Sequence, residues 1–387
     1  MKNAFALLLL LFINSSFSQE LPPINFFTPK EYKAENQNWS ISQGLDKNIY
    51  IANNIGLLEF NGARWKLYPS PNETILRSVK AIGEKIYSGS YMDFGYWKKN
   101  NFGILAYTSL SKELNIKLIE DEQFWDIIEI DNWILFQSLN RIYVLNSTDN
   151  SLQIIAAKTL ITKMYAVDGS VYFQNENEGI YKIDNGKSIL VTNDQLIKNS
   201  TVINIFIKDD FLLLETQKKG FYKLDKGKLI AWDISSNKLL SEVIVYNSIQ
   251  LSDGSFLLGT ISDGIIYLNS NGDLNYHINQ NNGLGNNTVL SLFEDIDKNI
   301  WLGLDNGINY VEMNSPFKIY HDRSGELGSI YAMQIFDNKL YLGTNQGLFY
   351  KEINSKTDFK LIAGTEGQVW SLVILDNQLF CGHNNGT

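Results

Sequence analysis

Aromatic and amide side chains are the residues of this chain best suited to bind a ligand. Apolar ring faces stack on the C–H surfaces of hydroxyl-rich molecules, and amides exchange hydrogen bonds with the hydroxyl groups. Such residues gather at the starts of predicted strands and in turns between strands, where Arg77 adds a cation. We expect a surface for a neutral ligand formed by Tyr91, Asp93, Trp125, Tyr165, Asn175, Glu176 and Trp370. The alternative for each residue is a structural role in strand packing or in a solvated turn.

Paired acids occur in the sequence, but their spacing does not favour catalysis. They lie at 120–122, 209–210 and 294–295. A glycosidase needs two carboxylates that face one bond across a pocket, and these come from distant parts of a sequence. Neighbouring acids in one turn are better explained as solvated turn residues, so we expect no catalytic residue.

Metal and cofactor sites are also not expected. Residues 295–299 read Asp-x-Asp-x-Asn, like the opening of a calcium loop. However, Ile300 stands where that loop needs glycine, and Asn306 stands where it needs glutamate. The three histidines lie far apart, and Cys381 is the single cysteine. This leaves no metal-ligand spacing and no intrachain disulfide.

The N-terminus has the form of an export signal. Lys2 precedes an apolar run from Ala4 to Ile13, and small polar residues lead to a predicted cleavage after Ser18. No later apolar stretch approaches the roughly 18 residues of a membrane span. The chain has 33 Lys and Arg against 42 Asp and Glu, a net charge of −9, which argues against a nucleic-acid partner. We therefore expect a periplasmic protein.

A module of about 40 residues recurs nine times, a period typical of propeller blades. Its clearest copies are 339–350, 299–310 and 254–267, and each predicts four short strands. Weaker copies centre on Gly56, Gly95, Arg141, Gly179 and Gly220, and a ninth begins at Asn377. The second strand of a copy carries a small residue at one fixed position. Glycine there would let neighbouring blades approach closely, as expected for Gly259, Gly303, Gly343 and Gly382.

The predicted fold is an all-β propeller of four-stranded antiparallel blades. We expect seven blades in a first ring at 19–322, and the first two blades of a second, truncated propeller at 323–387. Residues 26–32 are expected to add an outer strand to the seventh blade and close the ring. The alternatives are one ring of nine or more blades and a parallel β-helix, whose rungs are shorter.

The repeat resembles the two-component-regulator propeller repeat. The resemblance rests on residues 286–308 and on Gly89–Trp97, with Trp39–Ile41 and Gly56–Gly62 before it. It implies an exported sensor of the Bacteroidetes type. In that type, seven-bladed propellers precede a three-tyrosine domain, a membrane helix and a histidine-kinase or LuxR-type output module. Because the chain ends inside a repeat, we expect it to be the N-terminal part of a longer protein.

The preferred function is a non-enzymatic periplasmic sensor for signal transduction and transcription regulation. Its expected partner is an oligosaccharide, another periplasmic signal or a protein. The full-length protein is expected to form a homodimer and to be anchored in the inner membrane by a helix outside this chain. The alternatives are a secreted propeller enzyme acting on carbohydrate and a protein-binding assembly scaffold.

Overall fold

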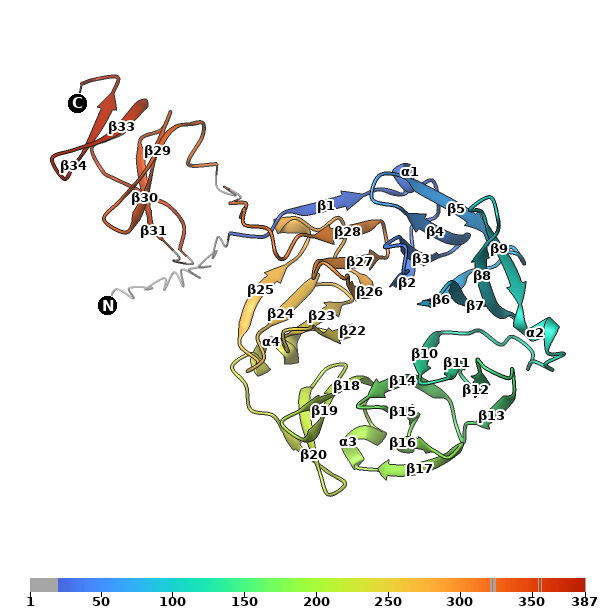
Figure 1. The fold of residues 1–387 in the computed structure, drawn as a ribbon. Coiled ribbons are helices and arrows are strands. Elements are labelled where there is room, and N and C mark those ends of the chain that lie inside the picture. The colour runs from blue at the N-terminus through green and yellow to red at the C-terminus, as the bar shows by residue number, and fades with distance from the viewer. Residues whose placement is uncertain (1–19, 321, 323–324, 354, 356, 387) are drawn as a thin grey trace, which may run out of the picture. The chain divides into compact units, whose positions relative to one another are not determined.

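The computed structural model describes residues 20–386 except 321, 323, 324, 354 and 356, so the predicted signal segment 1–18 lies outside the described residues. The described residues form eight four-stranded antiparallel sheets and one two-stranded sheet (Figure 1). None of their helices is long and apolar enough to cross a membrane. The chain divides into two compact units, one of residues 23–315 and one of 316–387 with 1–22.

Seven sheets of the larger unit surround one axis, as Figure 1 shows, and we number them blades I to VII. Blade I consists of β2 (Asn38–Gln43), β3 (Ile49–Asn53), β4 (Gly56–Phe60) and β5 (Trp65–Pro69). Blade II consists of β6 (Leu76–Ile82), β7 (Lys85–Ser90), β8 (Phe94–Lys99) and β9 (Leu105–Ser109). Blade III consists of β10 (Asp126–Ile130), β11 (Trp133–Gln137), β12 (Arg141–Asn146) and β13 (Leu152–Ala156). Blade IV consists of β14 (Ile161–Val167), β15 (Ser170–Asn175), β16 (Gly179–Asp184) and β17 (Lys187–Thr192). Blade V consists of β18 (Val202–Lys208), β19 (Phe211–Thr216), β20 (Gly220–Asp225) and β21 (Lys228–Ala231). Blade VI consists of β22 (Val245–Gln250), β23 (Phe256–Thr260), β24 (Ile265–Leu268) and β25 (Leu274–Ile278). Blade VII consists of β26 (Val289–Glu294), β27 (Ile300–Leu304) and β28 (Ile308–Val311), and its fourth strand is β1 (Ile24–Phe27).

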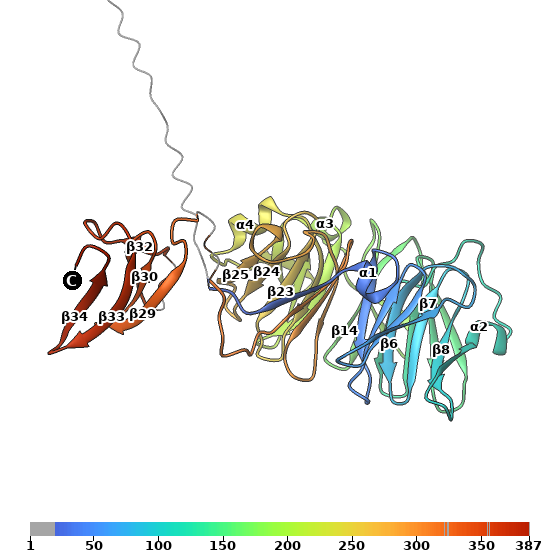
Figure 2. The same cartoon turned by 90° about the horizontal axis from the view of Figure 1, so that it is seen from above.

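Short helical turns lie between some of these strands (Figure 2). They are α1 (Pro29–Tyr32), α2 (Leu110–Glu113), α3 (Gln195–Lys198), α4 (Asn237–Glu242) and the 3-10 turn η1 (Gln280–Asn282). The smaller unit contains β29 (Ile330–Phe336), β30 (Lys339–Thr344), β31 (Leu348–Glu352) and β32 (Lys360–Leu361) in one sheet, and β33 (Val369–Leu375) with β34 (Gln378–His383) in another.

The ring of the larger unit is closed. The first strand of each blade contacts the first strand of the next, and β26 contacts β2. Seven blades therefore complete the circle, which confirms the predicted propeller and leaves no place for a ring of nine.

Strand β1 completes blade VII from the N-terminal side. Ile24 pairs with Val311 and Phe27 with Ile308 in an antiparallel register. The predicted outer strand at 26–32 is right only in its first two residues, because Pro29–Tyr32 turns into α1. A capping box between Thr28 and Glu31, with Pro29 in the first turn, stops the strand there.

The hydrophobic core lies between the blades. One cluster joins Phe206, Leu213 and Phe221 of blade V to Phe256 and Leu258 of blade VI. Equivalent clusters join blades I and II, II and III, III and IV, IV and V, and VII and I. A single sheet of four strands exposes two faces, and these clusters cover them.

Glycine in the second strand of a blade has the predicted packing role. A Cβ added to Gly259 would lie 2.7 Å from Cγ1 of Val289 in the next blade. A Cβ on Gly303 would lie 2.4 Å from the carbonyl oxygen of Asn38, across the junction of blades VII and I. Blades approach too closely at these points for any side chain.

Gly259→Ala is therefore expected to lower the free energy of unfolding by about 1–3 kcal/mol, as overpacking does. Urea unfolding of the single variants and of the double variant with Val289→Ala gives a double-mutant cycle. Because Val289→Ala removes the clashing Cγ1 atom, the double variant should be more stable than the sum of the two single effects. An additive cycle would show that the contact with Val289 does not cause the loss.

Candidate functional site

The turns between second and third strands and the loops between blades lie at the same end of the ring. The amide of Gln217, in the β19–β20 turn, donates to the carbonyl oxygen of Thr201 before β18 at 2.9 Å. Tyr91, in the β7–β8 turn, forms a β-bridge with Gln123 before β10. This is the end at which the sequence predicts a ligand-binding surface.

The innermost strands share an irregularity at this end. In six of the seven blades, the pairing between first and second strands skips one residue near the start of the first strand. In blade III, Trp125 stands one residue before the strand, at the equivalent place. This position is occupied by Trp39, Arg77, Trp125, Thr162, Ile203, Tyr246 and Leu290.

Three of these side chains stack on one another near the ring axis. The guanidinium carbon of Arg77 lies 4.2 Å from the centre of the Trp39 ring and 4.5 Å from that of Trp125. The two indoles meet edge to face with their centroids 6.3 Å apart. Because Trp39 and Trp125 belong to blades I and III, which are not neighbours, their contact places all three side chains toward the axis.

Two further residues complete this arrangement. Gln123 accepts a hydrogen bond from Nε of Arg77 through Oε1 at 3.2 Å. Tyr246 of blade VI interacts with Arg77 electrostatically. We call Trp39, Arg77, Gln123, Trp125 and Tyr246 the axial cluster.

Among the described residues, one donor of the axial cluster has no hydrogen-bond partner and its cation has no counter-charge. The Nε1 atom of Trp125 is buried and makes no hydrogen bond with the described residues. No carboxylate in the described part of the chain forms an ion pair with Arg77. Burial lowers the pKa of Arg77, because the cation has lost hydration without gaining a counter-charge. Buried polar groups normally have partners, so the unpaired indole N–H beside a cation makes the cluster the candidate site of this end.

Hydrogen bonds fix one side of the cluster. Trp39 donates through Nε1 to Oδ1 of Asn54 at 2.7 Å. Asn54 donates to Oε1 of Gln37 at 3.1 Å, and Gln37 donates to Oδ1 of Asp305 at 2.6 Å. This chain of side chains runs from blade I to the β27–β28 turn of blade VII and holds the Trp39 indole in place.

Next to the cluster, each inner strand adds a polar residue, and together these form a belt around the axis. They are Ser40, Ser78, Asp126, Lys163, Asn204, Asn247 and Ser291. Most members bond to the following blade: Ser291 donates to the carbonyl oxygen of Asn38 at 3.0 Å, and Asn204 to that of Ser248 at 2.7 Å. Lys163 instead reaches from blade IV to Oδ1 of Asn247 in blade VI, at 3.3 Å.

Glu215 is a buried acid beside this belt. It occupies the second-strand position that is glycine in blades II, VI and VII, and its Oε2 accepts a hydrogen bond from Ser248. Its Oε1 is buried without a hydrogen-bond partner in the described residues. Burial raises the pKa of Glu215 to about 8, although the Ser248 hydrogen bond and the charge of Lys163 act in the opposite direction. Burial also lowers the pKa of Lys163, against the attraction of Asp126 and Glu215.

Only some of the predicted site residues are available to a ligand at this end of the ring. Trp125 belongs to the axial cluster. Glu176 is exposed in its turn, and the Tyr91 hydroxyl donates to Oδ1 of Asp121 at 2.5 Å. These three residues lie where the sequence expected them.

The other predicted residues are buried in the ring or lie in the smaller unit. Asp93 is buried, and its carboxylate accepts hydrogen bonds from Ser109 and Ser111. Tyr165 is buried between blades IV and V and donates to the carbonyl oxygen of Val202 at 2.8 Å. Asn175 is also buried, and its Oδ1 has no hydrogen-bond partner among the described residues. We leave these residues out of the candidate site.

Trp370 lies in the smaller unit, at the same register position as Trp39 and Arg77 in the ring. It is 52% exposed and stacks on Tyr331 with ring centroids 4.7 Å apart. The recurrence of this position in both units is the signal that could have identified Trp39 and Tyr246 from the sequence.

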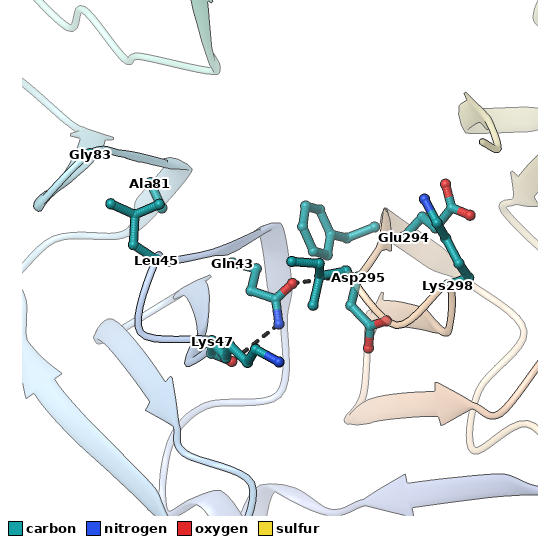
Figure 3. A pocket seen from close by; sticks show the side chains of 11 residues that line it. Gln43, Leu45, Lys47, Ala81, Gly83, Glu294, Asp295 and Lys298 are labelled. Carbon is teal, nitrogen blue, oxygen red and sulfur yellow. Dashed lines mark hydrogen bonds between the residues drawn. The ribbon is translucent and has the colours of Figure 1, made fainter.

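The opposite end of the ring has two hollows, of about 440 and 310 Å³. The larger one lies among the first turns of blades VII, I and II (Figure 3). Its polar groups already serve those turns: Gln43 accepts from the amide of Ile296 at 2.9 Å, and Asp295 from the amide of Asn299 at 2.9 Å. Asp295 also accepts from Nε1 of Trp301 at 3.1 Å, so the calcium-like segment is a hydrogen-bonded turn.

Two of the paired acids are less solvated than the sequence suggested, whereas Glu120, Asp121, Asp209 and Asp210 are exposed as expected. Glu122 is buried, where Tyr143 donates to its Oε2 at 2.8 Å and Ser138 to its Oε1 at 2.6 Å. Asp295 is buried as well. These carboxylates are structural hydrogen-bond acceptors and not solvated turn residues.

The closed ring and the axial cluster define a seven-bladed propeller with an aromatic and cationic site at one end. Neither a protein-family model nor a curated protein matches the chain. Among solved structures it is similar to the extracellular domain of the putative hybrid two component system BT3049 from B. thetaiotaomicron, with a TM-score of 0.67 and 17% identity over 94% of this chain and 52% of that one. The extracellular domain of BT4673 from the same organism gives a TM-score of 0.59 and 16% identity over 94% and 51%.

The chain thus spans about half the length of these two domains. It is also similar to virginiamycin B lyase from Staphylococcus aureus, with a TM-score of 0.56 and 14% identity over 74% of this chain and 98% of that one. At these identities the comparisons establish the propeller fold, which agrees with the fold of the suspected sensor family.

Proposed function

We propose that this chain is the ligand-sensing part of a signal-transduction protein, and that its ligand binds at the axial cluster. The observation that carries the proposal is the stacked arrangement of Trp39, Arg77 and Trp125. At one end of a closed ring it presents a cation that has no counter-charge, and an indole N–H that has no acceptor, among the residues the structure describes. Aromatic side chains with a few convergent polar groups are typical of small-molecule sites.

The likeness in fold to extracellular domains of hybrid two component systems supports a sensing role. In this proposal the signal at residues 1–18 directs the chain to the periplasm. A membrane anchor and an output module belong to other residues of a longer protein. Ligand binding shifts the equilibrium between two arrangements of that protein by its difference in affinity for them.

A secreted enzyme is the second candidate, because virginiamycin B lyase has a similar fold. Histidine is the side chain that most often transfers protons in catalysis, so its position bears on this candidate. In the ring of this chain, His277 lies on the outermost strand β25, with its Nε2 atom 3.2 Å from Oδ2 of Asp263. It is therefore away from the axial cluster. Incubating the purified protein with glycans and analysing the products separates the two candidates, since turnover would overturn the sensing role.

Trp39→Ala and Trp125→Ala are each expected to weaken ligand binding by about 2 kcal/mol, or about thirtyfold, as for a tryptophan at the centre of a binding site. The ligand is first found by thermal shift with a glycan library, because a ligand of the folded state raises its stability. Affinity is then measured by calorimetry. Trp133→Ala is the matched control, since this partly exposed tryptophan begins β11 at the other end of blade III. Unchanged affinity in both axial variants would place the ligand elsewhere.

A further inference from the structure

We propose that the axial cluster binds an anionic group carried by a saccharide, such as the carboxylate of a hexuronic acid, and that Arg77 holds this group. The inference rests on the function proposed above and names the class of its ligand.

The donors of Arg77 are the first argument. A guanidinium has five N–H donors and always carries its charge. In Arg77, Nε donates to Gln123, and the terminal nitrogens make no hydrogen bond or ion pair with the described residues. The residue is nevertheless partly buried. The protein thus withdraws a cation from water and leaves its outer edge without an acceptor.

The orientation of Arg77 is the second argument. Two indoles lie against the guanidinium at 4.2 and 4.5 Å, while Gln123 binds the Nε edge. These contacts fix the plane of the group and leave the pair of terminal nitrogens for a ligand. A carboxylate or sulfate matches this edge with two parallel hydrogen bonds.

The surrounding charges are the third argument. The group that acts on Arg77 electrostatically is the phenol of Tyr246. A phenol is neutral at physiological pH, and burial raises the pKa of Tyr246 further. Asp126, in the belt, interacts instead with Lys163 and Lys80. No acid in the described part of the chain therefore neutralises Arg77, and a neutral ligand would leave its charge uncompensated.

The remaining side chains favour an anion attached to a sugar ring. The buried Nε1 of Trp125 is an unused donor beside the guanidinium and suits a hydroxyl or ring oxygen. The indoles provide apolar surface for sugar C–H groups. A hexuronic acid carries all of these features on one ring: a carboxylate, hydroxyl groups and an apolar face.

The test compares ligands that differ only in charge. Calorimetry with the whole protein measures binding of hexuronic-acid oligosaccharides of two to six residues, their carboxyl-reduced neutral counterparts, and acetate and sulfate alone. The acidic oligosaccharides should bind at least tenfold more tightly than the neutral ones, and their affinity should fall with added salt. Arg77→Gln should remove this preference, and Arg77→Lys should restore it only in part because lysine lacks the two-pronged geometry.

Arg64→Gln is the control variant, since Arg64 is exposed on the turn before β5 and loses the same charge. Thermal unfolding checks that each variant is folded. If Arg77→Gln does not fold, Gln123→Ala, which frees the Arg77 side chain but keeps its charge, should still weaken acidic ligands several-fold more than neutral ones.

Equal affinity for acidic and neutral oligosaccharides, each still weakened by Trp39→Ala, would overturn the anion assignment and leave the proposed function standing. Binding of acetate or sulfate as tight as that of the oligosaccharide would overturn the saccharide assignment. Binding that neither Trp39→Ala nor Arg77→Gln changes would overturn the proposed function itself.

Discussion

A chain that begins at Pro29, without β1, is expected to lose about 3 kcal/mol or more of its free energy of unfolding and to associate. Blade VII would keep three strands, because β1 is its fourth and pairs with β28. The variant also loses Phe27, whose ring lies 5.5 Å from that of Phe60, 5.4 Å from Trp65 and 6.1 Å from Trp301. Loss of a fully buried phenylalanine side chain costs about 3–5 kcal/mol. Phe27 is partly buried, so its loss accounts for part of that range and the lost pairing of β1 with β28 adds to it.

Association follows from the edge that β28 would expose, since an unpaired strand is a template for pairing with another chain. Urea unfolding gives the stability, and light scattering gives the molar mass. A chain that begins at Glu20 and keeps β1 is the matched control. A synthetic peptide of residues 20–28, which contains β1 and does not overlap the shortened chain, should restore the unfolding midpoint. Identical midpoints for the two chains would mean that β1 does not secure the ring.

Glu215→Gln is expected to stabilise the protein increasingly as the pH rises from about 5 to about 8. The pKa of Glu215 is raised from 4.5 to about 8 in the folded state, mainly by burial. Above its unfolded-state pKa, the unfolded chain releases a proton that the folded chain keeps. The unfolded state therefore binds fewer protons, and the stability of the unmodified protein falls as the pH rises toward 8.

Glutamine has the same shape as glutamate but cannot ionise. The variant therefore does not lose the stability that the unmodified protein loses as the pH rises toward 8. The stability difference between variant and unmodified protein should grow by about 1 kcal/mol per pH unit over this range. Urea unfolding at pH 5, 6, 7 and 8 measures it. Asp126 and Lys163 are present in both proteins, so the difference between the two curves reports Glu215 together with its electrostatic coupling to Lys163. Glu176→Gln, at an exposed carboxyl, is the control; a difference for Glu215→Gln that is independent of pH would show that the buried acid is not held protonated.

Most of the fold could be predicted from the sequence because the repeat contains its own packing rule. A module of four short strands cannot cover its two faces, so its copies must stack, and the glycine of the second strand marks where they meet. Gly259 and Gly303 show this directly, since an added Cβ would collide with Val289 or with the backbone of Asn38. The length of β1 was less predictable, because the local capping of Pro29–Tyr32 competes with strand pairing.

The candidate site was less predictable because it depends on side-chain direction. Asp93 and Tyr165 occur in the expected segments, but hydrogen bonds to Ser111 and Val202 draw them into the interior. Conversely, Trp39 joins the site only because the pairing of β2 with β3 skips one residue at that point. Hydrophobic patterning does not reveal such a skip, and it does not show that indoles of blades I and III meet.

The skipped residue near the start of each inner strand has a consequence for how such a protein changes over generations. Because this residue stands outside the regular ladder of β-sheet pairing, its replacement disturbs few backbone hydrogen bonds. Blades of one ring carry side chains as different as Trp39, Arg77, Thr162 and Leu290 at this place on almost the same scaffold. Mutation can therefore alter what the ring recognises, one blade at a time, while the propeller that presents these side chains stays the same.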